Sequence, residues 1–279
     1  MHTPSDHSNK TGHYRLACQN IIWDEQRIEK RDYTVQAVSE AGYEGIEIGA
    51  RFLDLDHPNE FKAVLDAHRV HLVSIHIGWN PFLDSKPGTE RPPVTEEVER
   101  VIQFAKVTGT KFVNISGKDD DAQLKSGIAS LNQIGKTCHD NGMVLCYHNH
   151  GWEIRDDARI LREIIDQTDP SLVSFCPDLG WVRKLTSDFD GILKLLSPRV
   201  RLVHFKDYVA DGLDCLDNET EFGQGILDFD AAFQALRDHV CPDLWVIAEQ
   251  WKSTVNHLSP EEAIRRNYQF LKNYCDANR

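Results

Sequence analysis

Four short apolar runs of this sequence end in side chains that can bind a metal ion or carry protons. The densest is VLCYHNHGWE, residues 144–153, in which His148 and His150 are followed by the carboxylate of Glu153. Imidazole and carboxylate groups clustered directly after a buried strand are typical of an active site, because catalytic residues gather at strand ends. We therefore expect this segment to contribute to an enzyme centre.

The three other runs are SFCPD, which ends at Asp178, RLVH, which ends at His204, and LWVIAE, which ends at Glu249. A charge at the end of a buried strand is costly unless another group compensates it. Carboxylates combined with imidazole suit Mn²⁺, Mg²⁺, Co²⁺, Fe²⁺ or Zn²⁺. We expect these three side chains to bind one divalent metal, with Mn²⁺ as the first candidate. A buried ion-pair network is the alternative interpretation.

The fourth metal ligand stays open among three residues of the 144–153 segment. His148 stands at the strand end, and Glu153 could fold back from the following loop. His150 shares the face of His148 if the strand continues, because strand side chains alternate. A residue of this group that does not bind the metal is a candidate general acid or base, or a hydrogen-bond partner of a ligand. His150 and Glu153 are thus predicted catalytic residues, and Glu249 is a further candidate general base.

Further polar residues lie at or near the ends of other predicted strands. Lys206 lies two residues after His204, which places both on one face, so its ammonium group could stabilise an enolate oxygen. We predict that His76 acts as an acid and that Glu47 and Asn114 contact the substrate. A local salt bridge is the alternative explanation for each of these residues.

Tryptophans also follow several predicted strand ends. They are Trp23, Trp79, Trp152 and Trp251. Aromatic side chains offer flat apolar walls on which sugar rings can stack, although a single tryptophan is more often part of a core. Four near one rim favour a carbohydrate ligand, and Trp23, Trp79 and Trp152 are the predicted substrate contacts.

The scaffold that would gather these residues is a repeated unit, a short β-rich run followed by an amphipathic helix. We predict strands at residues 15–19, 45–48, 72–77, 112–115, 144–147, 173–176, 201–205 and 244–248. We predict helices over residues 61–67, 95–107, 120–141, 158–168, 189–196, 229–239 and 260–275, a first helix that Gly42 ends, and a long loop over 206–225. About eight such units predict an α/β fold, a single (β/α)8 TIM barrel over residues 14–279 with a flexible tail over 1–13.

Composition narrows the class of protein. The 279 residues carry a formal charge of −13, which argues against nucleic acid as a partner because its binders need a basic footprint. The seven cysteines are scattered without a CxxC pair, which indicates buried thiols, notably Cys146 and Cys176, and a cytoplasmic location. The sequence shows no signal peptide and no apolar stretch of about 18 residues, so we expect no membrane association.

Six segments together form a recognisable pattern. They are AGYEGIEIGARF (41–52), YHNHGWE (147–153), PDLGW (177–181), VHFKD (203–207), GQGILDF (223–229) and IAEQ (247–250). On these segments the chain resembles the xylose-isomerase-like TIM-barrel superfamily, the sugar phosphate isomerases, epimerases and their relatives. It looks most like the inosose dehydratase branch, and departs from it by YHNH in place of YHHH at the fifth strand. The resemblance implies a small carbohydrate or cyclitol substrate and is compatible with a homo-oligomer, since dimers and tetramers are common in the family.

The resemblance also implies a ligand set. In that family the metal ligands stand at the ends of strands five to eight, and Asp178, His204 and Glu249 match the last three positions. The epimerases of the family carry glutamates at strands five and eight as paired acid and base, whereas strand five here ends in His148. If His148 binds the metal, the resemblance favours a lyase such as a dehydratase over a two-carboxylate epimerase.

The predicted function is a divalent-metal-dependent dehydratase, or another lyase, acting on a keto-sugar or ketocyclitol. The metal would bind the ketone and a neighbouring hydroxyl oxygen and stabilise an enediolate. A base among His150, Glu153 and Glu249 would remove the proton, and His76 or Lys206 would assist the leaving oxygen. An isomerase or epimerase that uses the same proton abstraction is the alternative.

Two other classes of protein share this fold. A DNA-repair endonuclease is disfavoured by the charge of −13 and by the lack of the larger ligand set that a trinuclear zinc site needs. A non-catalytic sugar-binding protein is disfavoured by the retained Asp178, His204 and Glu249. The GQGILDF segment, ahead of a predicted helix, could cradle a phosphate group.

Overall fold

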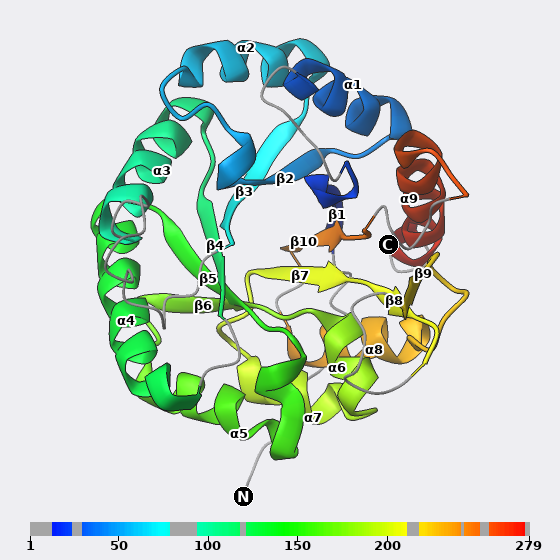
Figure 1. The fold of residues 1–279 in the computed structure, drawn as a ribbon. Helices are drawn as coiled ribbons and strands as arrows, with labels where there is room; N and C mark the ends of the chain where they lie inside the picture. The colour runs from blue at the N-terminus through cyan, green and yellow to red at the C-terminus, as the bar shows by residue number, and fades with distance from the viewer. Residues whose placement is uncertain are drawn as a thin grey trace, which may run out of the picture.

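Eight parallel strands form a barrel that helices surround on the outside (Figure 1). The computed structural model describes residues 13–23, 30–78, 94–117, 121–210, 218–240, 243–251 and 257–276. The barrel strands are β1 (His13–Gln19), β2 (Gly45–Gly49), β3 (His71–Ile77), β4 (Phe112–Ser116), β5 (Val144–His148), β6 (Val173–Cys176), β7 (Leu202–Phe205) and β10 (Asp243–Ala248). They pair in the order β6-β5-β4-β3-β2-β1-β10-β7. Bridges from Phe175 to Val200 and from Asp178 to His204 join the two ends of this order, which confirms the predicted TIM barrel. Of the predicted tail over 1–13, the described residues include His13 alone, and it belongs to β1.

Helices connect most of the strands and cover the barrel (Figure 1). They are α1 (Arg31–Ala41), α2 (Pro58–His68), α3 (Val94–Thr108), α4 (Leu124–Asp140), α5 (Gly151–Gln167), α6 (Leu179–Leu185), α7 (Phe189–Leu196), α8 (Phe229–His239) and α9 (Pro260–Asp276). Gly42 ends α1 as predicted, with a left-handed φ of 104° that lets its N–H reach the carbonyls of Val38 and Ser39. α5 begins earlier than predicted and leaves helical geometry over residues 155–158, so the predicted helix at 158–168 is its second part.

Two local features differ from the prediction. α6 follows Asp178 directly, because the Oδ1 atom of Asp178 accepts the N–H of Trp181 and caps the helix. The segment expected to be a loop after β7 contains β8 (Asp207–Tyr208) and β9 (Glu219–Thr220), which pair antiparallel. Both features fix chain segments that border the carboxyl ends of the strands.

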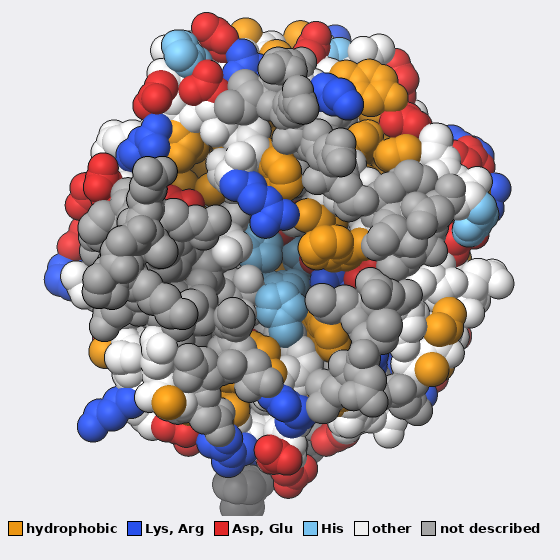
Figure 2. Space-filling model, viewed as in Figure 1, with side chains coloured by type: hydrophobic (Ala, Val, Ile, Leu, Met, Phe, Trp, Pro, Cys, Tyr) orange, Lys and Arg blue, Asp and Glu red, His pale blue; other side chains and the backbone are white. Residues whose placement is uncertain are grey.

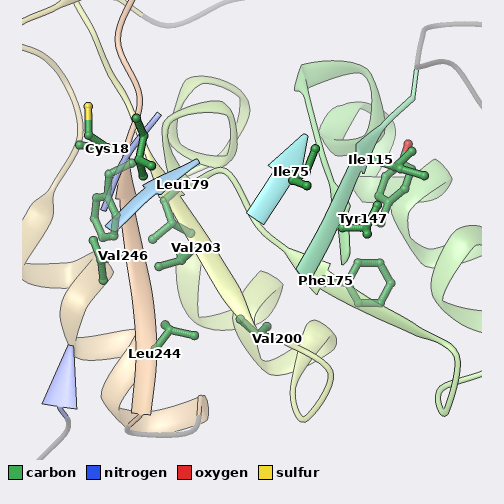
Figure 3. Packing of buried hydrophobic residues seen from close by; sticks show 14 of the residues in the cluster. Cys18, Ile75, Ile115, Tyr147, Phe175, Leu179, Val200, Val203, Leu244 and Val246 are labelled. Atoms are coloured by element: carbon green, nitrogen blue, oxygen red, sulfur yellow. The ribbon is translucent and has the colours of Figure 1, made fainter. Parts of the chain in front are cut away.

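Alternation along the strands separates an inner from an outer apolar layer. The inner layer consists of Ala17, Val73, Cys146, Cys176, Leu202, Trp245 and Ile247, with Phe112 and Val144 packed against it. Val73 belongs to it although Ile75 lies in the outer layer, because a register shift between β2 and β3, after Leu72, interrupts the alternation there. Figure 3 shows members of the outer layer, among them Ile75, Ile115, Tyr147, Phe175, Val203 and Val246. Because the side-chain period of a strand is two, the next inward positions are His148, Asp178, His204 and Glu249. The alternation along the strands therefore places these four side chains on the inner face, at the mouth of the barrel.

The cysteines of the described residues are free thiols. Cys146 and Cys176 are buried, as predicted, and so are Cys18, Cys138 and Cys275. In the part of the chain that the structure describes, no helix combines the length and apolar character needed to cross a membrane.

Candidate metal centre and active site

Four predicted ligands from four neighbouring strands converge at the carboxyl end of the barrel. One ligand atom each of His148, Asp178, His204 and Glu249 lies within 4.8 Å of the others, and all four residues are buried. Nδ1 of His204 is 2.6 Å from Oε2 of Glu249, and Nε2 of His148 is 3.7 Å from Oδ2 of Asp178. Two imidazoles and two carboxylates at this spacing could surround one divalent cation.

The chemistry of these donors fits a cation. Oδ2 of Asp178 is buried and has no hydrogen-bond partner, although the ammonium of Lys206 lies 3.3 Å away, so this oxygen keeps lone pairs that a cation could use. Burial, together with the rings of His204 and His150, lowers the pKa of His148 well below its usual range. Because His148 is therefore neutral, it keeps a lone pair that a metal can use.

Glu153, the alternative fourth ligand, is hydrogen-bonded to Tyr147 and to the start of α5. Its Oε1 accepts the hydroxyl of Tyr147 at 2.6 Å, and its Oε2 accepts the backbone N–H of His150 at 2.8 Å. The side chain of His150 accepts in return from the N3 backbone N–H, so the two residues form a capping box at the start of α5. Glu153 is fully buried and its two oxygens face Tyr147 and the helix end.

His150 lies beside the cluster. Its ring centroid is 5.1 Å from that of His148 and 6.1 Å from that of Trp181, and its side chain lines the central cavity. Burial, with Lys206 as a further cause, lowers the pKa of His150 to about 3. The imidazole is thus unprotonated near pH 7, and a pKa this low also makes it a weak base.

Cys176 offers a second possible donor set. A ligand atom of Cys176 groups with those of His148 and His204 within 4.8 Å. Cys176 is fully buried on β6, two residues before Asp178, and burial raises the pKa of its thiol. A thiol in this position would add affinity for Zn²⁺ if it ionised on binding.

Lys206 shares the inner face with His204, as predicted. Its Nζ lies 2.8 Å from Oε1 of Glu249 and 3.3 Å from Oδ2 of Asp178. Burial disfavours the ammonium, but the two carboxylates outweigh it and hold the pKa of Lys206 well above its usual range. A positive charge is therefore fixed beside the cluster, where an oxyanion could develop.

Gly180 allows this lysine to sit so close to α6. A Cβ atom on Gly180 would lie 2.6 Å from the carbonyl oxygen of Lys206 and 2.7 Å from its Cβ. Both distances are shorter than real side chains show, so the PDLGW motif requires a glycine where α6 meets the end of β7.

Glu47 and Asn114 lie deeper in the barrel than a substrate contact would. Oε1 of Glu47 is 3.0 Å from Nε2 of His204 and 3.5 Å from Nδ1 of His76, while its Oε2 accepts from Ser74 and from Asn114. Neither Glu47 nor Asn114 is exposed. Burial favours the protonated acid, but His204 outweighs it and holds the pKa of Glu47 well below its usual range. The geometry favours a role in orienting His204.

His76 stands at the cavity wall. Its Nε2 lies 3.2 Å from the hydroxyl of Ser116, and its ring centroid is 5.4 Å from that of His148. The side chain is 11% exposed, which distinguishes it from the fully buried residues beneath it. His76 is thus placed to exchange a proton with a molecule in the cavity.

The cavity above the cluster has a volume of about 450 Å³. Figure 2 shows pale blue histidines at the floor of this central hollow and basic side chains near its edge. The lining residues are Gln19, Ile21, Gly49, Ala50, Arg51, Phe52, Leu53, Leu55, His76, Gly78, Glu97, Arg100, Ser116, His148, His150, Glu249 and Trp251. Its walls are therefore mixed, with apolar side chains beside polar ones.

The tryptophans singled out in the sequence occupy different positions in the structure. Trp251 lines the cavity, whereas Trp23 and Trp152 are buried. The indole N–H of Trp23 donates to Glu261 on α9 at 3.2 Å, which gives this side chain a packing role. Trp79 lies outside the described residues.

The GQGILDF segment is occupied by a carboxylate of the chain itself. Oδ2 of Asp207 accepts the N–H groups of Gly223 and Gly225, and its Oδ1 accepts those of Leu227 and Tyr208, all at 3.0 Å. These amides are therefore unavailable to a phosphate group, contrary to the expectation from sequence. Asp207 ends the VHFKD motif, but nothing in that motif indicated which amides it would bind.

A buried carboxylate that the sequence analysis did not single out lies near the same site. Glu219 on β9 accepts the N–H of Trp251 at 3.0 Å. Burial raises the pKa of Glu219 to about 8, with Lys206 opposing and Glu249 adding to this shift. The acidic loop was predicted to be functional as a whole, yet Glu219 could be found only once β8 and β9 had paired.

The fold and the buried His, Asp, His and Glu cluster define a parallel TIM-barrel protein with a candidate divalent-metal centre. The chain belongs to the xylose isomerase-like TIM barrel family, whose model matches residues 35–274. It is 25% identical over 287 residues to an inosose dehydratase of Clostridium perfringens, a match that covers 88% of this chain and 93% of that protein.

Two solved structures have a similar fold. The IOLI protein with a binding zinc atom has a TM-score of 0.75 at 17% identity, covering 95% of this chain and 99% of that one. A D-psicose 3-epimerase from Clostridium cellulolyticum H10, solved with D-tagatose, has a TM-score of 0.69 at 14% identity, covering 94% and 98%. At these identities the likeness concerns the fold.

Proposed function

We propose that this protein is a divalent-metal-dependent dehydratase that acts on a keto-sugar or ketocyclitol. The observation that carries the proposal is the buried cluster of His148, Asp178, His204 and Glu249 with the charged Lys206 beside it. The inosose dehydratase relative and the epimerase neighbour support an enzyme that acts on sugars. The substrate would be a small carbohydrate or cyclitol held in the cavity above the cluster.

The metal would be held by His148, Asp178, His204 and Glu249. When bound, a divalent ion acts as a Lewis acid that polarises a carbonyl and makes the adjacent C–H more acidic. Mn²⁺ remains our proposal for its identity, and the zinc in the IOLI protein makes Zn²⁺ the first alternative. Glu153 is the less suitable fourth ligand, because its oxygens face Tyr147 and the start of α5, and it is His148 whose ligand atom groups with those of the other three residues.

We assign proton abstraction to His150. This side chain is unprotonated near pH 7, as a general base must be, and its position in the cavity beside His148 carries the assignment. The ammonium of Lys206 would stabilise negative charge on the substrate oxygen. His76, at the cavity wall beside Ser116, would donate a proton to the departing hydroxyl, which then leaves as water.

An isomerase or epimerase is the alternative, and one observation favours it. His76 and His150 both line the cavity, so a proton removed by one imidazole could be returned at another position by the other. The first half of the reaction would be the same. A cytoplasmic location, the absence of nucleic-acid and membrane partners, and a homo-oligomeric state remain predictions.

The test is a proton-exchange assay with metal-loaded protein in D₂O. Keto-sugars and 2-keto-myo-inositol would be supplied, and products followed by NMR and by enone absorbance. Exchange with loss of water is expected, and Glu249→Gln should abolish it. Conversion between isomers without elimination would favour the alternative, and no exchange despite a bound metal would contradict both.

A further inference from the structure

The central cavity extends well beyond the histidines on the side of β2. Its wall there is built from η3 (Ala50–Phe52) and the residues that follow, with Phe52, Leu53 and Leu55 among the lining side chains. The volume of about 450 Å³ falls in the range of pockets that bury drug-sized ligands, which is more than one six-membered ring needs. The site therefore has room for a substituent on the sugar.

Arg51 is the basic residue of this wall. Its guanidinium carbon lies 4.6 Å from the ring centroid of Phe52. Its Nη1 atom is 3.8 Å from where a Cβ on Gly78 would lie, just after β3. The side chain thus reaches from the end of β2 to the end of β3, across the edge of the mouth.

Arg51 differs from the other strong bases of the site in having no anionic partner among the described residues. Arg100, on the same cavity, is 3.0 Å from Oδ1 of Asp56, and Lys206 is paired with Glu249 and Asp178. The chain as a whole carries −13, so an anion would meet repulsion elsewhere on the surface. The unpaired guanidinium of Arg51 is therefore a local positive charge at the mouth of the cavity in a chain that is negatively charged overall.

The chemistry of a guanidinium narrows what it would bind. Its planar fork of N–H donors matches the oxygens of a carboxylate or phosphate. The other anion-binding feature of the sequence, the glycine-bearing segment after β9, already binds the carboxylate of Asp207. Among the described residues that line this cavity, Arg51 is therefore the strong base without an anionic partner.

We propose that Arg51 forms a second subsite, which holds an anionic substituent, a carboxylate or a phosphate, of the sugar substrate. Phe52 and Leu55 line the cavity beside it, where they would pack against the carbon skeleton between that substituent and the reacting ketone. This inference rests on the proposed function, because it specifies the substrate class of the same site.

The test compares binding of neutral and anionic sugars to the metal-loaded protein by calorimetry. The probes are glucose, glucuronate and glucose 6-phosphate, and the last two distinguish a carboxylate from a phosphate. We expect one of the anions to bind more tightly than glucose. Arg51→Gln should lower the ratio of anion to glucose affinity by roughly tenfold or more, and Arg51→Lys by less.

Arg31→Gln is the matched control, because Arg31 pairs with Glu60 on the outer helices and should leave the ratio unchanged. If Arg51→Gln weakened the binding of glucose and of the anionic sugars by the same factor, the proposed subsite would be wrong. It would also be wrong if the wild-type protein bound neither anionic sugar more tightly than glucose. A different result would contradict the proposed function. Absence of deuterium exchange with any keto-sugar would overturn it while Arg51-dependent binding remained.

Discussion

Nε2 of His204 lies 3.0 Å from Oε1 of Glu47, and neither side chain is exposed to solvent. The other ring nitrogen, Nδ1, is 2.6 Å from Oε2 of Glu249. We therefore expect the Glu47 carboxylate to help orient the His204 ring, as the outer carboxylates of metal-binding histidines commonly do. Glu47 comes from β2, almost opposite β7 in the strand order, so the barrel interior makes this contact possible.

Replacing Glu47 with glutamine should weaken metal binding. The substitution keeps the shape of the side chain but removes the charge that orients His204, so the affinity for Mn²⁺ or Zn²⁺ should fall about 10–100-fold. Calorimetric titration of the metal-free protein with Mn²⁺ or Zn²⁺ measures this affinity. Glu163→Gln on the outside of α5 is the control, and an unchanged Kd in Glu47→Gln would show that His204 is oriented without it.

His148 and His150 should separate metal binding from proton transfer. His148→Ala should lose the bound metal, measured as metal content per chain after gel filtration. His150→Asn should keep the metal, because asparagine preserves the cap of α5, and should lower the exchange rate about 10²–10⁴-fold. If His150→Asn lost the metal while His148→Ala kept it, the two roles would have to be exchanged.

Asp207→Asn should destabilise the fold. Asp207 accepts four backbone N–H groups, and an amide in its place would turn at least one donor toward those N–H groups. We expect a loss of about 2 kcal/mol in the free energy of unfolding, measured by urea titration. Asp228→Asn is the matched control, since it caps α8 and asparagine caps equally well. If both variants had the same free energy of unfolding, the proposed stabilising role of Asp207 would be wrong.

Glu219 should make stability depend on pH. Burial raises its pKa to about 8 in the folded chain, whereas an unfolded chain loses this proton near pH 4.3. The folded state therefore binds the extra proton between these values, and its stability falls as pH rises through that window. Glu219→Gln has no proton to lose, so relative to this variant the wild type should lose roughly 2–4 kcal/mol from pH 5 to pH 8. Urea titrations at several pH values measure this difference, and parallel curves for the two proteins would refute it.

The sequence by itself determined the barrel and most of the cluster. The apolar runs ending in Asp178, His204 and Glu249 predicted both the strands and the inward direction of their last side chains, because the two-residue period of a strand is a local property. The same rule placed Lys206 beside His204 and His148 two residues beyond Cys146. Each of these inferences needed only neighbours along the chain.

The tertiary structure decided what the local pattern left open. Glu47, a predicted substrate contact, lies beneath His204, which comes from a strand distant in the sequence. Asp207 and the glycine-bearing segment, 16 to 20 residues apart, met only through the pairing of β8 and β9. A strand's period fixes where a side chain points, but its partners come from other strands and helices, and only strand pairing and barrel closure bring those partners within hydrogen-bonding distance.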